Sequence, residues 1–166
     1  MENKKTLSIV VDNVSGVLSK VTNLFSRRGF NIDSLAVGPT EKDEFSRITV
    51  EVHCTDELLA QIVAQLKKLP CVYNVIILDR DYMISRELIV IKVKANDETR
   101  SRIIEIVNIF RGRIIDLAPE SLIIEVTGKD DKAEAMIKML EPFGIIELAR
   151  TGVVALGRGS TNIYGN

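Results

Sequence analysis

The chain has 166 residues, of which 46% are hydrophobic and 27% charged, a composition typical of folded globular proteins that excludes extensive disorder. Ten basic and eleven acidic residues precede Ser85 and twelve of each follow it, so neither half shows the cationic excess typical of nucleic-acid binding. No apolar run approaches the roughly 20 residues that a membrane-spanning helix requires.

The first residues, MENKKTLSIVVDN, lack the apolar segment of about 7 to 15 residues found in signal peptides, so we expect a cytoplasmic protein. Cys54 and Cys71 lie 17 positions apart without a C-x-x-C motif, and His53 is the only histidine. This pattern predicts neither a metal site nor a disulfide. For His53 we expect an exposed position on a strand, without a carboxylate partner.

Hydrophobic periodicity predicts the order βαββαβ for the first half of the chain. Gly29 is typical of a helix end, Thr55 of a helix cap, and Pro70 of a stop. The predicted elements are a strand over 6–12, a helix over 15–28, a strand over 31–38, a turn over 39–44, a strand over 45–53, a helix from 55 to Pro70, and a strand over 72–79.

The same order recurs after a polar connector over 80–86. The predicted elements are a strand over 88–95, a helix over 97–110, a strand over 112–117, a turn at Pro119, a strand over 122–127, a helix over 130–140, and a strand over 145–156. Short sequence segments also match, because NLFSRRGFNIDSL in the first half resembles NIFRGRIIDL in the second. We therefore predict an α+β protein of two tandem ferredoxin-like units, each an antiparallel sheet with its helices on one face.

This organisation predicts one domain over 1–79, a second over 80–159, and a flexible tail over 160–166 rich in Gly, Ser and Asn. Helices on a single face leave the other face of each sheet and two sheet edges open. Because open edges attract further strands, we expect a homodimer that joins two sheets edge to edge.

The stretch VVDNVSGVLSKV places Gly16 at the start of the first predicted helix. The first four N–H groups of a helix lack intrahelical acceptors, and a glycine lets a small carboxylate approach them closely. Asn13 precedes this helix, and Asn31 and Ile32 begin an edge strand, so an amino-acid ligand would find both donors and acceptors. The alternative is that Gly16 only eases a tight turn and that Asn13 or Ser15 caps the helix.

Resemblance to a known family adds to this interpretation. The segments LSIVVDNVSGVLSKV, LFSRRGFNIDSL, SRITV, RELIVIKV, IFRGRIID and RTGVVALGRG closely resemble the small, regulatory subunits of acetolactate synthase, also called acetohydroxyacid synthase. The resemblance covers about residues 5 to 159. Its first half alone would indicate an ACT domain, the widespread amino-acid-sensing module, whereas its second half resembles the C-terminal domain of these subunits.

The resemblance implies that ACT domains pair across a homodimer and bind valine between them, giving feedback inhibition of valine and isoleucine biosynthesis. It implies that one chain contributes Asn13, Gly16, Val17 and Leu18 to the effector and the other contributes Asn31 and Ile32. The C-terminal domain is expected to help activate a separate catalytic large subunit, which holds thiamine diphosphate, magnesium and FAD. The small subunit itself would hold no cofactor, metal or catalytic residue.

The same residues bear on three other classes of protein. The carboxylates Glu41, Asp43 and Glu44 fall in a predicted turn, and no nucleophile and base are visible, which argues against an enzyme such as an acylphosphatase. The strand SRITVEV lacks the aromatic residues on which RNA-binding βαββαβ modules stack bases. The strongest rival is a stand-alone, amino-acid-responsive regulator of another protein, which would share the ACT half. The sequence does not say which branched-chain amino acid binds best.

Overall fold

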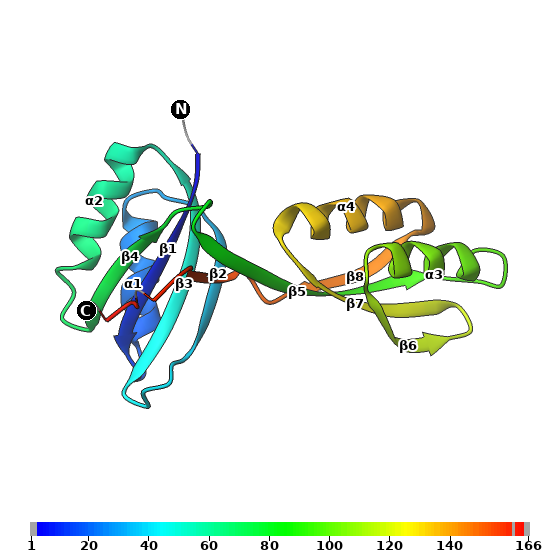
Figure 1. Cartoon of the computed structure of the whole chain (residues 1–166), viewed down its shortest axis with the longest axis horizontal. Helices are drawn as coiled ribbons and strands as arrows, with labels where there is room; N and C mark the ends of the chain where they lie inside the picture. The colour runs from blue at the N-terminus through cyan, green and yellow to red at the C-terminus, as the bar shows by residue number, and fades with distance from the viewer. Residues whose placement is uncertain (1–2, 161, 165–166) are drawn as a thin grey trace. The chain divides into compact units, whose positions relative to one another are not determined.

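The computed structural model describes residues 3–160 and 162–164 (Figure 1). The chain folds into two compact units. Unit 1 comprises the chain up to Ile84 together with the C-terminal residues from Val153 on, and unit 2 comprises Ser85–Gly152. The chain therefore leaves the first unit once and returns to it.

Unit 1 contains the predicted βαββαβ order. Its elements are β1 (Asn3–Asp12), α1 (Val17–Arg27), β2 (Ile32–Pro39), β3 (Phe45–Cys54), α2 (Asp56–Leu66) and β4 (Val72–Leu78). All pairs in the sheet are antiparallel, in the order β2-β3-β1-β4, so β2 and β4 lie at its edges. The Thr55 hydroxyl accepts a hydrogen bond from the Leu58 N–H and caps α2, as its position predicted.

Both helices of unit 1 pack on the same face of this sheet. Leu7, Ile9 and Val11 alternate along β1 and lie in one cluster with Val21 and Phe25 of α1 and with buried residues of α2. The five named residues of β1 and α1 are each at most 2% exposed. Burying one large aliphatic or aromatic side chain stabilises the fold by about 1.5 to 3 kcal/mol, so the amphipathic pattern of α1 fixes which side it presents to the sheet.

The opposite face of the same sheet is also covered, which differs from the expectation of an open face. Thr6, Ser8 and Val10 point to this face and are at most 1% exposed. The C-terminal residues Val153, Ala155 and Ile163 are buried here too, and Figure 1 shows their segment in red across the sheet. The covering segment, residues 153–160 and 162–164, includes β9 (Val154–Gly157), which pairs with β5.

The end of this covering segment is held by specific contacts. The Asn74 side-chain amide donates to the Ile163 carbonyl, and the Tyr164 hydroxyl donates to the Thr40 hydroxyl at 3.1 Å. The Tyr164 ring lies 5.8 Å from the Phe45 ring, and the Lys42 amine lies 4.0 Å from its centre. Residues 162–164 are thus docked on unit 1 rather than forming the flexible tail expected over 160–166. Residues 161, 165 and 166 of that tail lie outside the described residues.

Unit 2 repeats the architecture. Its elements are β5 (Met83–Lys94), which begins in unit 1, α3 (Arg100–Ile109), β6 (Arg113–Ala118), β7 (Ser121–Gly128), α4 (Asp130–Leu140), a short 3-10 helix (Glu141–Phe143) and β8 (Ile145–Arg150). The strands follow the antiparallel order β6-β7-β5-β8, and residues of α3 and α4 form one buried cluster with the sheet. The prediction of two ferredoxin-like α+β repeats is confirmed.

Unit 2 also holds an ion pair between a buried glutamate and a partly exposed arginine, which the sequence pattern did not indicate. The Glu87 side chain on β5 is 5% exposed and accepts a hydrogen bond from the Arg150 guanidinium at 3.1 Å. The same guanidinium donates to Glu134 of α4 at 2.7 Å. Burial lowers the pKa of Arg150, but the hydrogen bonds to Glu134 and Glu87 outweigh it, so the pKa is raised overall. Arg150 thereby joins the end of β8 to a strand and a helix.

Several predicted boundaries differ from the structure, among them those of the connector, of helix α3 and of the last strand. Part of the expected connector over 80–86 is strand, since β5 begins at Met83. Helix α3 begins at Arg100 rather than 97, because the Asn96 side chain accepts hydrogen bonds from the N–H groups of Glu98 and Thr99. The single strand expected over 145–156 is two strands, separated at Gly152, whose φ is +81°.

Candidate functional site

The predicted site centres on Gly16, which lies immediately before α1. Its φ is +84° and its ψ is −9°, a left-handed conformation that glycine adopts without strain. A Cβ placed there would meet no described atom within 4 Å, so the space beside the backbone is open. No side chain caps the helix, and its first turn contains no acidic residue. The alternative in which Asn13 or Ser15 caps α1 is therefore excluded.

Helix α1 consequently presents unpaired backbone donors at this end. The first intrahelical hydrogen bond runs from the Lys20 N–H to the Gly16 carbonyl. The N–H groups of the first turn before Lys20 have no intrahelical acceptor, and the aligned peptides add a partial positive charge. An uncapped helix start beside a glycine is chemically suited to a small carboxylate.

The Asn13 side chain forms hydrogen bonds within the protein that the sequence did not indicate. Its amide nitrogen donates to the Asp43 carbonyl at 3.0 Å, and its amide oxygen accepts from the Ser46 hydroxyl at 2.9 Å. Its backbone N–H donates to the Glu44 carbonyl at 2.8 Å. These bonds fix the loop before α1 against the turn between β2 and β3. Because a primary amide has two donors and two acceptor lone pairs, one of each remains for a ligand.

Val17 and Leu18 differ in what they can offer. The Val17 side chain is 3% exposed and belongs to the core of unit 1, so only its backbone N–H is available to a ligand. The Leu18 side chain is 41% exposed and, with the exposed Val14, gives the helix start an apolar border. An aliphatic side chain of a bound amino acid would therefore meet Leu18 rather than Val17.

Asn31 and Ile32 lie at the other end of the sheet. Ile32 pairs with Val52, which pairs with Lys5 of β1, whereas the loop that carries Asn13 and Gly16 follows Asp12. Seven residues of β1 separate these two levels, or about 23 Å at 3.3 Å per residue. Within one chain the structure thus brings Asn13, Gly16, Val17 and Leu18 together, but not Asn31 and Ile32 with them.

The position of β2 shows how a second copy could join the two groups. Among the described strands, β2 pairs only with β3, which leaves its other edge unpaired. In an antiparallel, two-fold pairing of two β2 edges, the start of each strand lies opposite the end of the other. The end of β2, Pro39, is level with Ser46, which pairs with Val11 just before the α1 loop. Such a pairing carries Asn31 of one copy toward Gly16 of the other.

The structure contains a polar contact near the start of β2 that the sequence did not predict. The expectation for His53 included no carboxylate partner, but its Nδ1 lies 2.6 Å from an Asp33 carboxylate oxygen. The His53 side chain is 55% exposed, as expected for the surface of a strand. The two residues lie 20 positions apart on adjacent antiparallel strands, and only the register of β2 against β3 reveals them as neighbours.

Comparison with known proteins places the whole chain. A family model described as "AHAS small subunit-like ACT domain" matches residues 7–74, and one described as "Small subunit of acetolactate synthase" matches residues 86–159. The acetolactate synthase small subunit of Mycolicibacterium smegmatis is 50% identical over 158 residues, covering 95% of this chain and 93% of that protein. The chain belongs to the family of acetolactate synthase small subunits.

Two further relatives agree. A probable acetolactate synthase small subunit from Archaeoglobus fulgidus is 47% identical over 157 residues, covering 95% of this chain and 98% of that protein. The crystal structure of the acetolactate synthase small subunit from Thermotoga maritima matches with a TM-score of 0.89 and 42% identity, covering 96% of this chain and 99% of that one. The family resemblance stated from the sequence motifs is thereby confirmed, and membership in a small-subunit family implies a catalytic large subunit as partner.

One further observation concerns the membrane. No helix within residues 3–160 and 162–164 of this small subunit has the length and apolar character needed to cross a bilayer.

Proposed function

We propose that this chain is a non-catalytic regulatory subunit that activates the large subunit of acetolactate synthase in the cytoplasm and makes it sensitive to valine. The catalytic chemistry, with thiamine diphosphate, magnesium and FAD, belongs to the large subunit. The observation that carries the proposal is the uncapped, glycine-cleared start of α1 in a chain of this family.

The effector site is shared between two chains of a homodimer. One chain supplies the backbone N–H groups that follow Gly16, the remaining amide groups of Asn13 and the apolar border at Leu18. The other chain supplies Asn31 and Ile32 from its paired β2 edge. A carboxylate at the helix start, an ammonium near an amide oxygen and a small aliphatic side chain together describe a branched-chain amino acid.

The expected affinity suits a metabolite sensor. A helix-end contact contributes about 0.3 to 2 kcal/mol, each hydrogen bond about 0.5 to 1.5, and burial of a valine-sized side chain about 1.5 to 3. Before association costs, these terms sum to roughly 3 to 9 kcal/mol, which corresponds to dissociation constants from several millimolar to about micromolar. An effector bound across two chains stabilises one arrangement of the dimer, and this differential affinity is what can alter the large subunit. Unit 2 contributes to that activation.

The experiment is reconstitution of acetolactate synthesis from the purified large subunit and this chain. We expect this chain to raise the rate of the large subunit and valine to lower it again, with leucine, isoleucine and lysine compared at equal concentration. A chain that binds valine in titration calorimetry yet never changes the rate would contradict the proposal and favour the stand-alone regulator. If the chain binds none of these amino acids, the proposed effector site itself is excluded.

A further inference from the structure

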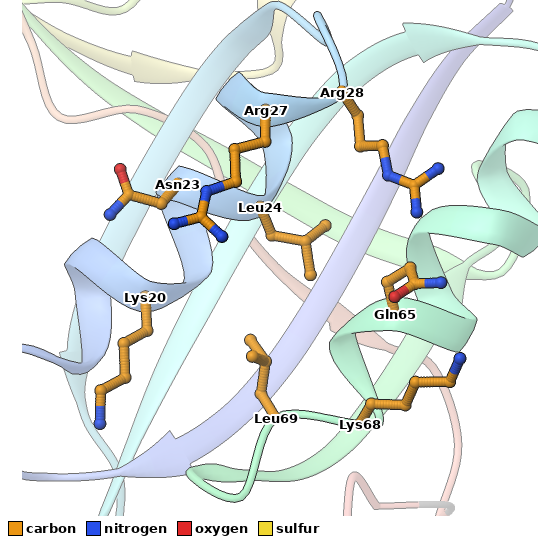
Figure 2. A pocket seen from close by; sticks show the side chains of 8 residues that line it. All are labelled: Lys20, Asn23, Leu24, Arg27, Arg28, Gln65, Lys68 and Leu69. Carbon is orange, nitrogen blue, oxygen red and sulfur yellow. The ribbon is translucent and has the colours of Figure 1, made fainter.

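A cation-lined groove runs between the two helices of unit 1. Its volume is about 450 Å³. Figure 2 shows Leu24 and Leu69 pointing toward each other at its floor, with basic and amide side chains around them. The residues that line this α1–α2 groove are Lys20, Asn23, Leu24, Arg27, Arg28, Gln65, Lys68 and Leu69.

The positive charge of the groove is not balanced by carboxylates nearby in the sequence. Residues 13–32 and 58–78, which contain every lining residue, hold five basic residues and no acidic one across 41 positions. At the chain's average of 23 acidic residues in 166, such a length would hold about six. The chain as a whole has a net charge of −1, so the excess of positive charge in these two ranges is a local feature.

The four basic side chains of the groove are also available. In the part of the chain that the structure describes, Lys20, Arg27, Arg28 and Lys68 form no ion pair. Arg27 in the last turn of α1 complements the helix dipole, but the dipole disfavours Lys20 in the first turn. Helix stability therefore does not account for the whole cluster, whereas attraction of an anionic surface would.

Two other surfaces of unit 1 already have occupants. The covering segment lies on the second face of the sheet, and the proposed function assigns the β2 edge to a second copy of this chain. The helix face is assigned to neither of these occupants. A second copy placed there by a two-fold axis would bring like charges together, which costs free energy.

Resting on the proposed function, we infer that the α1–α2 groove docks a carboxylate-bearing surface of the catalytic large subunit. Leu24 and Leu69 provide an apolar floor for an aliphatic side chain of that surface, Asn23 and Gln65 offer amide hydrogen bonds, and the four basic side chains surround them with positive charge. A polar rim around a small apolar centre is the usual anatomy of a protein–protein interface. The ACT domain then contacts the large subunit directly as well as sensing valine.

The test uses the reconstituted holoenzyme and two neighbouring residues. Lys68 lines the groove, whereas Lys67 is also exposed at the same end of α2 but does not line it. We expect Lys68→Glu to raise the concentration of this chain needed for half-maximal activation about tenfold, and Arg27→Glu combined with Lys68→Glu to raise it further. Lys67→Glu makes the same charge change and should shift it less than about twofold. Valine binding by the isolated variants, measured by calorimetry, should stay unchanged.

Salt provides a second readout. Activation by the unaltered chain should weaken as KCl rises, and the double variant should lose most of that dependence. If Lys68→Glu and Lys67→Glu behave alike, or if inorganic phosphate competes far better than KCl at equal ionic strength, the groove is not a docking site for a protein surface. If the unaltered chain never activates the large subunit, the proposed function fails and this assignment fails with it. Activation that the groove variants leave intact removes the groove alone.

Discussion

Gly16 combines three properties that no other residue offers together at the start of α1. It adopts a positive φ, it leaves open space where a side chain would begin, and it provides no side-chain cap for the N–H groups that follow. A non-glycine residue in this conformation would cost about 1 to 2 kcal/mol. The sequence indicated the glycine and its helix, but the absence of a cap from Asn13 follows only from contacts that Asn13 makes with Asp43 and Ser46.

A substitution pair separates charge from space at this residue. Gly16→Asp and Gly16→Asn add nearly the same volume, and both residues tolerate left-handed backbone better than most. We expect Gly16→Asp to weaken valine binding at least about tenfold more than Gly16→Asn, because only the aspartate repels the ligand carboxylate. Titration calorimetry gives the two affinities, and far-UV circular dichroism checks that both variants fold. Equal affinities would show that no carboxylate binds at this helix start.

Among the elements, the covering segment was the least predictable from the sequence. Period-two patterns located the strands of both units, and cap and stop residues such as Thr55 located the helices. A pattern does not show which sheet a strand joins, so periodicity predicts residues 153–156 as a continuation of β8. The break depends on the positive φ of Gly152 and on pairing with distant residues, neither of which local periodicity contains.

The covering segment should contribute to the stability of unit 1. Ile163 is 4% exposed, so Ile163→Ala should lower the free energy of unfolding by about 1 to 3 kcal/mol, less than a central core site because the segment can adjust. Leu156 in the same segment is 57% exposed, and Leu156→Ala should change the unfolding free energy by less than about 0.5 kcal/mol. Urea denaturation followed by circular dichroism measures both. Equal effects would mean that the end of the chain is not docked in solution.

For the whole molecule, the tandem repeat could be predicted from the sequence, because both halves have the same order of elements and similar sequence motifs at the same place in that order. The way in which two chains assemble could be predicted less completely. The sequence placed Asn31 and Ile32 on an edge strand, and the family resemblance assigned them to a second chain. The register of β1, β2 and β3 supplies the physical reason, since about 23 Å of sheet separates them from Gly16 within one chain.

The central claim is therefore that two chains build each effector site, and mixing two defective variants tests it most directly. Gly16→Asp damages one side of the site and Asn31→Ala the other, so neither homodimer should bind valine well. In a mixed dimer both substitutions lie in the same site, because that site takes Gly16 from one chain and Asn31 from the other. The second site then contains neither substitution and is intact. Unfolding and refolding an equimolar mixture should restore about one quarter of the valine sites of the unaltered protein in calorimetry. A mixture that binds no more valine than its two components would contradict a shared site.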